Sequence, residues 1–171
     1  MKELADSIAQ LRSTIPTLQG MLGSVGEDEW NWHPKPEAWS ILDVVNHLAD
    51  EERVDFRVRL DLTLHQPEKD WPGIDPEGAV KNDLYQNRSL QEALDDFVAE
   101  RERSLQWLET LNKPDWSSTH THPLFGSMQA GTLMASWVGH DLLHLRQIAR
   151  LRWDFLAQQV APFSLRYAGD W

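Results

Sequence analysis

Two histidines one helical turn apart are the clearest chemical signal in the sequence. His140 and His144 lie in a stretch from Thr132 to Ala161 that has no proline and no internal break, which predicts a helix. Side chains four residues apart leave the same helix face, so the two imidazoles could take adjacent positions on one metal ion. The spacing alone is a weak signal, because two histidines four apart also occur by chance. A third ligand from elsewhere in the chain would strengthen the metal interpretation.

A third histidine lies in a second predicted helix. His47 is part of the apolar run Val44–Ala49, which is otherwise ready to be buried. The helix is expected from Ser40 to about His65, because Ser40 is a good N-cap and a capping-box-like acid follows three residues later. The period of an α-helix places five other side chains on the face of His47, namely Asp43, Val44, Glu51, Val54 and Val58. Two helices that each carry histidine on a core-facing stripe make a three-histidine site possible.

Another histidine pair, His120 and His122, lies in the segment 115–131, which is predicted to be a loop that could form a short hairpin. An H-x-H pair in a loop can hold a metal ion. Beside serines and threonines, however, so short a pair is usually solvated surface. We therefore expect surface histidines here rather than ligands.

The composition limits the classes of function. The chain has 171 residues, of which 41% are hydrophobic and 25% charged, as is typical of one globular domain over residues 1–171. It has no cysteine, so any metal must be held by nitrogen and oxygen atoms. A net charge of −11 argues against nucleic-acid binding. No apolar run approaches the length of a membrane span, and the acidic N-terminus lacks a signal-peptide region. A cytoplasmic protein without membrane contact is therefore expected.

Four predicted helices indicate an all-α four-helix bundle. The first covers residues 2–24, where Pro16 predicts a kink rather than a break because the apolar seam continues in phase. The second is the helix of His47, and the third follows an N-cap at Ser89. The apolar stripe of the third helix is interrupted by Arg101, which either snorkels or pairs with an acid. Thr132 is the expected N-cap of the last helix, and the tail from residue 162 is expected to pack over the bundle as an extended segment.

The connection between the second and third helices is long. It runs from Gln66 to Arg88, and its first part holds three prolines and two glycines. Antiparallel neighbours in a bundle usually need far shorter connections. The length therefore predicts a crossover that lets the third helix run parallel to the second.

The ordered motifs resemble the DinB/YfiT-like family of four-helix-bundle metalloproteins. One part of the resemblance is Glu-Trp-Asn-Trp-His-Pro at residues 29–34, followed by Trp39-Ser40-Ile41 and then His47-Leu48. The other part is the run from His140 to Ile148, which is similar to the H-x3-H-x2-Q signature of the family's last helix. The resemblance covers residues 4 to about 153.

The resemblance implies a bundle that runs up-down-down-up and a divalent metal, often zinc or nickel, held by His47, His140 and His144. It further implies transfer of a small-molecule thiol to an electrophile, or a related isomerisation or hydrolysis, with the metal activating thiol or water. A homodimer acting on a small-molecule substrate is expected. Two alternatives stay open, namely a dimeric metal-binding stress-response protein without turnover, and a bundle whose histidines are merely buried.

Five further side chains are candidates for supporting such a site. Ligating histidines usually donate their second N–H to an oxygen, and Asp43, Glu51 and Gln147 are placed to accept it. Trp39 and Trp137 could form walls of the pocket. For the two acids the alternative is an ordinary solvated helix position, and for the tryptophans it is plain core packing.

Overall fold

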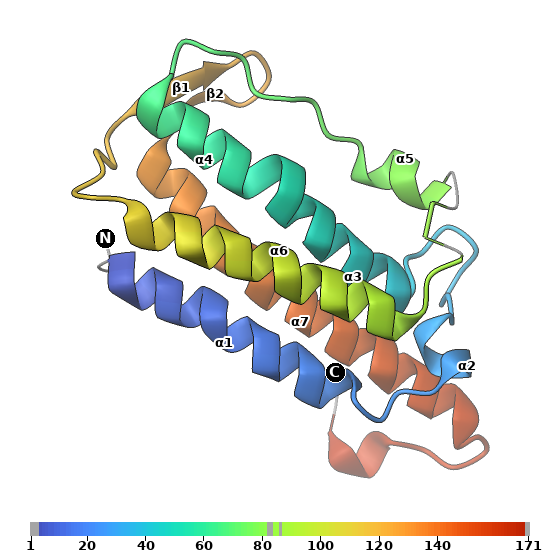
Figure 1. Ribbon diagram of the computed structural model, residues 1–171. Coiled ribbons are helices and arrows are strands. Elements are labelled where there is room, and N and C mark those ends of the chain that lie inside the picture. The colour runs from blue at the N-terminus through green and yellow to red at the C-terminus, as the bar shows by residue number, and fades with distance from the viewer. Residues whose placement is uncertain (1–3, 82–83, 86, 170–171) are drawn as a thin grey trace.

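The computed structural model of the chain describes residues 4–81, 84–85 and 87–169. Within this part, four long helical stretches pack side by side as a bundle, so the predicted all-α four-helix bundle is confirmed (Figure 1). The stretches are α1 (Leu4–Leu22), a continuous run of α3 (Ile41–Asp50), a π-helical segment (Glu51–Asp55) and α4 (Phe56–His65), then α6 (Leu90–Thr110) and α7 (Ala130–Gln159). The short helices α2 (Glu27–Trp30) and α5 (Pro76–Lys81) lie in connections, and a 3-10 turn (Arg166–Ala168) lies near the C-terminus. Every described helix is too short or too polar to cross a membrane.

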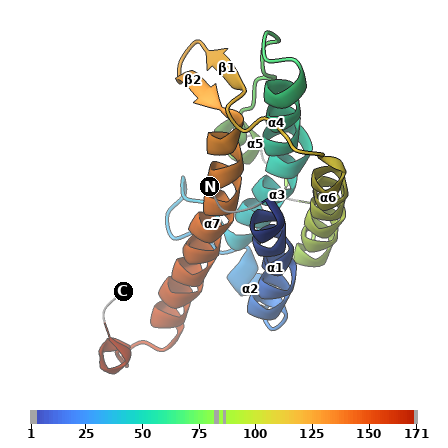
Figure 2. The ribbon, with the colours of Figure 1, turned by 90° about the vertical axis from the view of Figure 1, so that its left-hand side faces the viewer.

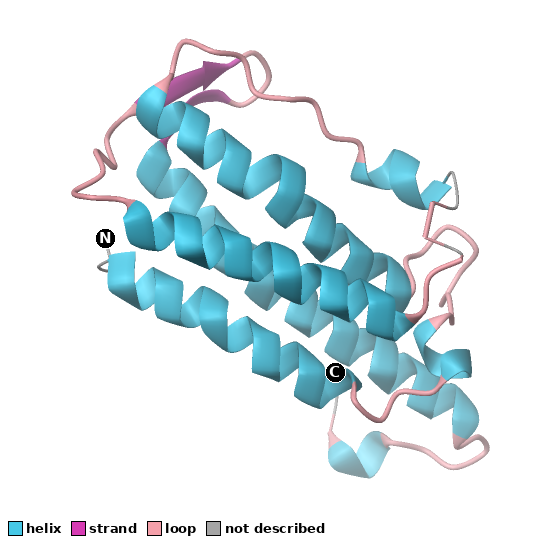
Figure 3. Cartoon of the chain, in the orientation of Figure 1, coloured by secondary structure: helices cyan, strands magenta, loops and turns pink. Residues whose placement is uncertain are grey.

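The helices run up-down-down-up, as the resemblance implied. In Figure 1, α1 leads away from the end of the bundle marked N, the α3–α4 run returns to that end, α6 runs toward it again, and α7 leads away. The second and third long stretches are therefore parallel. The connection between them crosses the length of the bundle and carries α5, a helix that the sequence did not predict (Figure 3). Two aromatic residues of the crossover anchor it: Trp71 is buried, and Tyr85 donates a hydrogen bond to Asp50 at 2.6 Å.

Two of the three predicted helix N-caps are found in the structure, and the third is not. Ser40 and Ser89 both form complete capping boxes with the acid three residues on. The prediction that Thr132 caps the last helix is wrong, because α7 already begins at Ala130. The hairpin of β1 (Thr119–His122) and β2 (Gly126–Gln129) leads directly into it. The amide of Ala130 donates to the backbone carbonyl of Ser118, and the amide of Gly131 donates to that of Trp116. The first two amides of α7 therefore need no side-chain cap.

The tail after α7 does not cover the bundle. Apart from Leu165, the described residues from Ala161 to Gly169 are exposed, and the predicted packing is therefore wrong for this part; residues 170 and 171 lie outside the described chain. Figure 2 shows the reason, since α7 extends past the ends of its neighbours and carries the tail away from the bundle. At the other end of the chain, α1 continues through Pro16 as one helix, as the unbroken seam predicts.

The π-helical segment changes which side chains of the second stretch face inward. A π-helix turn holds one more residue than a regular turn, so it rotates all later positions around the helix axis. Glu51, Glu52 and Asp55 are buried as a result, whereas Val54, which a regular helix would place on the face of His47, is 42% exposed. The predicted face is therefore correct up to Glu51 and wrong for Val54, while Val58 is half-buried.

A polar layer divides the apolar core into two clusters. One cluster includes Leu18, Phe97 and Ile148, and the other includes Leu11, Leu105 and Trp137. Between them lies Arg101, which has no solvent exposure, together with Glu52 at 1% and Asp141 at 3%. The layer thus holds three charged side chains that water does not reach.

Arg101 holds this layer together by charge-assisted hydrogen bonds. Its guanidinium donates two bonds to Asp141, at 2.6 and 2.7 Å, one to Glu52 at 2.7 Å, and one to the carbonyl of Leu11 at 2.9 Å. Trp137 Nε1 donates to Glu52, and Thr14 donates to Asp141, each at 2.6 Å. Four helical stretches meet at this cluster, so it fixes the π-helical segment against α7.

Replacement of Arg101 by methionine should destabilise the protein by about 3–5 kcal/mol, because two buried carboxylates lose their cation. Arg103 lies two residues further along α6 and provides a matched control. Its side chain is 63% exposed and forms an ion pair with Glu100. R103M should cost less than about 1 kcal/mol. Urea unfolding of both variants measures the difference, and equal midpoints would contradict a structural role for the buried cluster.

Candidate metal centre

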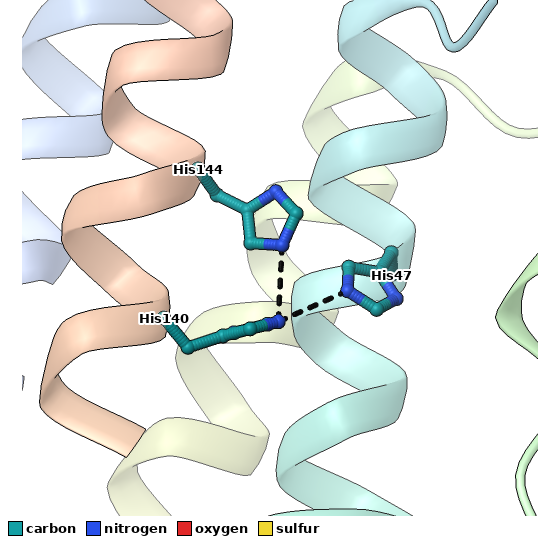
Figure 4. Close-up of side chains that lie close together, drawn as sticks. All are labelled: His47, His140 and His144. Carbon is teal, nitrogen blue, oxygen red and sulfur yellow. Dashed lines mark hydrogen bonds between the residues drawn. The ribbon is translucent and has the colours of Figure 1, made fainter. Parts of the chain in front are cut away.

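Three histidines from two helices point at one position inside the bundle. His47 extends from α3, and His140 and His144 extend from successive turns of α7 (Figure 4). His47 and His144 are buried, at 6% and 7% exposure, and His140 is half-buried. In the described part of the chain they form the one group of three or more potential ligand side chains that converge. The structure therefore brings together the three residues that the sequence singled out, while metal ligation itself stays a prediction.

The spacing of the ring nitrogens fits a single ion. Nε2 of His140 lies 3.2 Å from Nε2 of His47 and 3.0 Å from Nε2 of His144, and the three ligand atoms all lie within 4.8 Å of one another. Zinc–nitrogen bonds of about 2.0–2.1 Å in a tetrahedron separate the ligand nitrogens by about 3.3 Å. The donor set therefore matches a divalent ion that favours imidazole, with at least one further position for water or a substrate atom.

Polar side chains face the far side of two of the rings, and one of them makes a hydrogen bond. His144 Nδ1 lies 2.7 Å from Gln147 Oε1, and because an amide oxygen only accepts, the ring proton belongs on Nδ1. His47 Nδ1 faces the carboxyl of Glu51 at 3.6 Å. The bond to Gln147 leaves the Nε2 lone pair of His144 directed at the shared position, which is the tautomer that a metal ligand requires, whereas the contact with Glu51 is too long for a hydrogen bond. Gln147 and Glu51 thus occupy the supporting places expected from the sequence.

Burial keeps the imidazoles neutral. Desolvation, followed by repulsion from the neighbouring histidines, lowers the pKa of His47 to about 3. Desolvation also lowers the pKa of His140 to about 3, with His144 and Arg101 adding repulsion. The pKa of His144 is lowered by burial as well, and the hydrogen bond to Gln147 opposes that shift. Neutral rings can bind a cation without first releasing a proton.

Glu51 shows the opposite shift for the same reason. Burial, followed by the contact with Asp55, raises the pKa of Glu51 to about 9. Its carboxyl group therefore keeps a proton at neutral pH, although the positive charge of Arg59 opposes the shift. A positive charge placed nearby would favour the ionised form.

Among the predicted aromatic walls, Trp39 lies at the histidines and Trp137 lies deeper. The Trp39 ring centroid is 4.9 Å from that of His47 and 6.4 Å from that of His144, with the latter two rings parallel within 6°. Trp137 is fully buried and stacks on Phe56. The ring centroid of Phe56 in turn lies 5.1 Å from that of His140. Trp137 therefore supports the site indirectly, through Phe56.

Asp43 serves the N-terminus of α3. Its carboxylate Oδ2 accepts hydrogen bonds from the amide and the hydroxyl of Ser40, each at 2.8 Å, and so completes the capping box of α3. The sequence motif had signalled both roles, and the geometry uses this acid for the cap.

The loop histidines are not both solvated surface. His120 is 3% exposed, contacts the carbonyl of Pro67 at 2.9 Å through Nδ1, and stacks on Trp71 with ring centroids 4.4 Å apart. The expectation of a solvated pair is therefore wrong for His120, because the hairpin folds over the crossover. His122 remains half-buried, and neither belongs to the converging ligand group of the described residues.

Sequence reasoning missed three residues that hold the site in place. These are Glu52, Asp141 and Phe56, which follow Glu51, His140 and Asp55 in the chain. The sequence did signal Arg101 as an interruption of an apolar stripe, but not which acids it meets. A charge on a core-facing stripe of one helix, with acids at the same depth on two others, is the pattern that could have indicated them.

Comparisons with known proteins agree with this geometry. A family model described as the DinB superfamily matches residues 9–148. Among solved structures, the chain is similar to YfiT from Bacillus subtilis, described as a probable metal-dependent hydrolase with an unusual four-helix bundle topology. The TM-score is 0.79 at 18% sequence identity, over 91% of this chain and 89% of that chain, a likeness that shows the fold alone. Among curated proteins, none matches the sequence.

Metal-free protein should lose stability as the pH falls from about 6.5 toward 3. The unfolded chain takes up protons on its histidines below pH ~6.5, whereas His47 and His140 in the folded protein exclude them until about pH 3. Each such histidine contributes a slope of up to about 1.4 kcal/mol per pH unit. The raised pKa of Glu51 acts in the opposite sense between about pH 9 and 4.5.

Comparison with a variant isolates the histidine contribution. The double variant His47→Gln, His140→Gln should show a flatter dependence of unfolding free energy on pH in the presence of a chelator. His65→Gln removes a half-exposed histidine on α4 and should retain the wild-type profile. Parallel profiles for wild type and the double variant would contradict burial of neutral rings.

Proposed function

The chain belongs to the DinB superfamily, and from this premise we propose that it is a metal-dependent enzyme whose divalent ion is held by His47, His140 and His144. The observation that carries the proposal is the convergence of three Nε2 atoms on one position. Zinc or nickel is the expected ion, since three neutral imidazoles and no thiolate suit both metals. The description of YfiT as a probable metal-dependent hydrolase supports the same class of chemistry.

The reaction that we propose is attack by an activated thiol or water on a small-molecule electrophile. An ion bound at this site supplies a lowered pKa for the incoming thiol or water. The chain has no cysteine, so a thiol nucleophile must come from a substrate. Thiol S-transfer is the leading form of the proposal, with hydrolysis or isomerisation as related forms.

The protein's own side chains would orient the ligands and exclude water. Gln147 fixes the tautomer of His144, and Glu51 faces the proton of His47. Trp39 covers the His47 and His144 rings on one side, which limits solvent at the site. The predicted homodimer and cytoplasmic location belong to the same proposal.

Purified protein should contain about one divalent ion per chain, and His140→Gln should lower the metal affinity by more than about 100-fold, since loss of a ligand exceeds the effect of losing an outer partner. Gln147→Ala should weaken it by about 10-fold through the freed His144 ring. Elemental analysis and competition with a chromophoric chelator measure both. The control is His122→Gln in the hairpin, which should bind metal like the wild type.

Two results would separate the candidate functions. Metal content that survives both His47→Gln and His140→Gln would contradict the three-histidine site and leave merely buried histidines. Stoichiometric metal with no turnover over a panel of thiols and electrophiles would favour the metal-binding stress-response protein instead.

A further inference from the structure

The connection between α1 and α3 carries the Glu-Trp-Asn-Trp-His-Pro motif and ends beside the three histidines. Its first part is bound to α7, because Glu29 accepts a hydrogen bond from Arg152 at 2.9 Å and the Trp32 ring meets Phe155 edge-on, with ring centroids 5.7 Å apart. Its last residue before the N-cap of α3 is Trp39, which contacts two of the three candidate ligands. The connection therefore joins the C-terminal half of α7 to the candidate metal centre.

His33, the histidine of this motif, binds the second half of the connection. Its Nδ1 lies 2.7 Å from the carbonyl oxygen of Ala38, and since that oxygen only accepts, Nδ1 is the donor. The ring also lies beside the capping box of α3, with Nδ1 3.8 Å from Asp43 Oδ2. The amide of Ala38 donates to the carbonyl of Lys35 at 2.9 Å. The segment from His33 to Ala38 is thus closed on itself directly before Trp39.

Hydrogen bonds hold both peptide groups that flank Trp39. The carbonyl of Ala38 belongs to the peptide group before Trp39 and accepts from His33. The amide of Ser40 belongs to the peptide group after it and donates to Asp43 Oδ2 at 2.8 Å. The orientations of these two planar groups determine the backbone angles of Trp39, and the backbone angles restrict the direction of its side chain. His33 therefore contributes to the placement of a ring that it does not touch.

The two aromatic walls of the histidine site differ in what positions them. Phe56, whose ring centroid lies 5.1 Å from that of His140, extends from α4. Trp39 extends from a connection and lies 4.9 Å from the His47 ring and 6.4 Å from the His144 ring. A helix fixes the first wall, whereas the second depends on the hydrogen bonds of the connection. Loss of those bonds would uncover His47 and His144 on one side.

We infer that His33 is a positioning residue, which holds the ring of Trp39 across one side of the three-histidine centre and so excludes bulky molecules from that side. The inference deepens the proposed function and rests on it for the identity of the substrate, which would be a slender thiol or electrophile rather than a branched one. Its first test concerns access to the histidines and needs no bound ion.

Chemical modification of the metal-free protein measures this access. Diethyl pyrocarbonate acylates neutral imidazole rings, and its rate at His47 can be followed by mass spectrometry of peptides. His33→Leu removes the donor and should raise this rate by up to about tenfold, the change in population that loss of one hydrogen bond allows. His33→Asn places an amide N–H at the position of Nδ1 and should keep the wild-type rate.

His65→Leu is the matched control. His65 is 53% exposed, against 43% for His33, and its Nδ1 contacts a backbone carbonyl of its own helix, that of Asp61, at 3.1 Å. Its replacement should leave the rate at His47 unchanged. His120 provides an internal reference, because it is 3% exposed in the hairpin at the opposite end of the bundle from α2 (Figure 1).

A double variant shows whether His33 acts through Trp39. Trp39→Ala should raise the rate at His47 by at least as much as His33→Leu, and the two substitutions together should give no further increase, because their effects follow one path. An unchanged rate at His47 in His33→Leu would overturn the inference. So would an equal rise at His120, which indicates general loosening of the fold, or a further rise when His33→Leu is added to Trp39→Ala.

Thiols of different bulk test the consequence for the substrate in cobalt-loaded protein. Thiolate binding to Co²⁺ gives a charge-transfer absorption band, so the dissociation constants of ethanethiol and of the branched 2-methyl-2-propanethiol can be measured. His33→Leu and Trp39→Ala should reduce the wild-type preference for ethanethiol, and His33→Asn should retain it. The same ratio of dissociation constants in all four proteins would overturn the exclusion of bulky molecules. Absence of any thiol band in protein that contains cobalt would overturn the proposed function, and the modification rates would still decide the role of His33.

Discussion

The structure depends on a charge that has no access to water. Arg101 crosses the centre of the bundle between two apolar clusters and joins α1, the π-helical segment and α7 through its bonds to Leu11, Glu52 and Asp141. Such a layer contributes little net stability compared with apolar packing of the same volume, but it tolerates few alternative registers. A slide of α7 by one turn would remove Asp141 from the guanidinium. The same slide would carry His140 and His144 away from His47. The register of the fold and the geometry of the candidate metal centre are therefore set by one interaction.

The charges around the histidines favour a cation there. Glu52 and Asp141 place two carboxyl groups beside the one guanidinium of Arg101, and Asp141 directly follows His140 in α7. The imidazoles are neutral because burial lowers their pKa. A divalent ion at the shared position would be bound by neutral imidazoles, with two carboxyl groups in the layer behind them. In a medium of low dielectric constant, carboxylate groups at that distance stabilise a cation. A protonated imidazole would gain less, because the same burial that removes water also brings the three rings within repulsion distance.

The sequence predicted those features that depend on local rules. The two capping boxes, the length of the crossover, the helical spacing of His140 and His144 and the burial of His47 each follow from residues near one another in the chain. The π-helical segment did not, because hydrophobic periodicity assumes a constant turn; it placed Glu51 and Val54 on one face and gave no sign that Glu52 and Asp55 are buried. The start of α7 was also missed, since the hairpin rather than Thr132 satisfies its first amides. The partners of Arg101 lie on other helices, and pairings of that kind are fixed by tertiary packing alone.

The π-helical turn explains how two adjacent acids, Glu51 and Glu52, contact different parts of the structure. In a regular helix Glu51 and Glu52 would diverge by about 100° around the helix axis. Here both are buried, at 6% and 1% exposure. Glu52 turns to Arg101 and Trp137 in the polar layer, and Glu51 turns to His47 and a cavity under the crossover. π-helical turns often lie at functional sites because they expose a position that packing would otherwise absorb. In this chain the turn therefore separates two adjacent carboxyl groups: that of Glu52 is bound by the buried guanidinium of Arg101, and that of Glu51 shares a hydrogen bond with Asp55 beside His47 at the wall of the cavity.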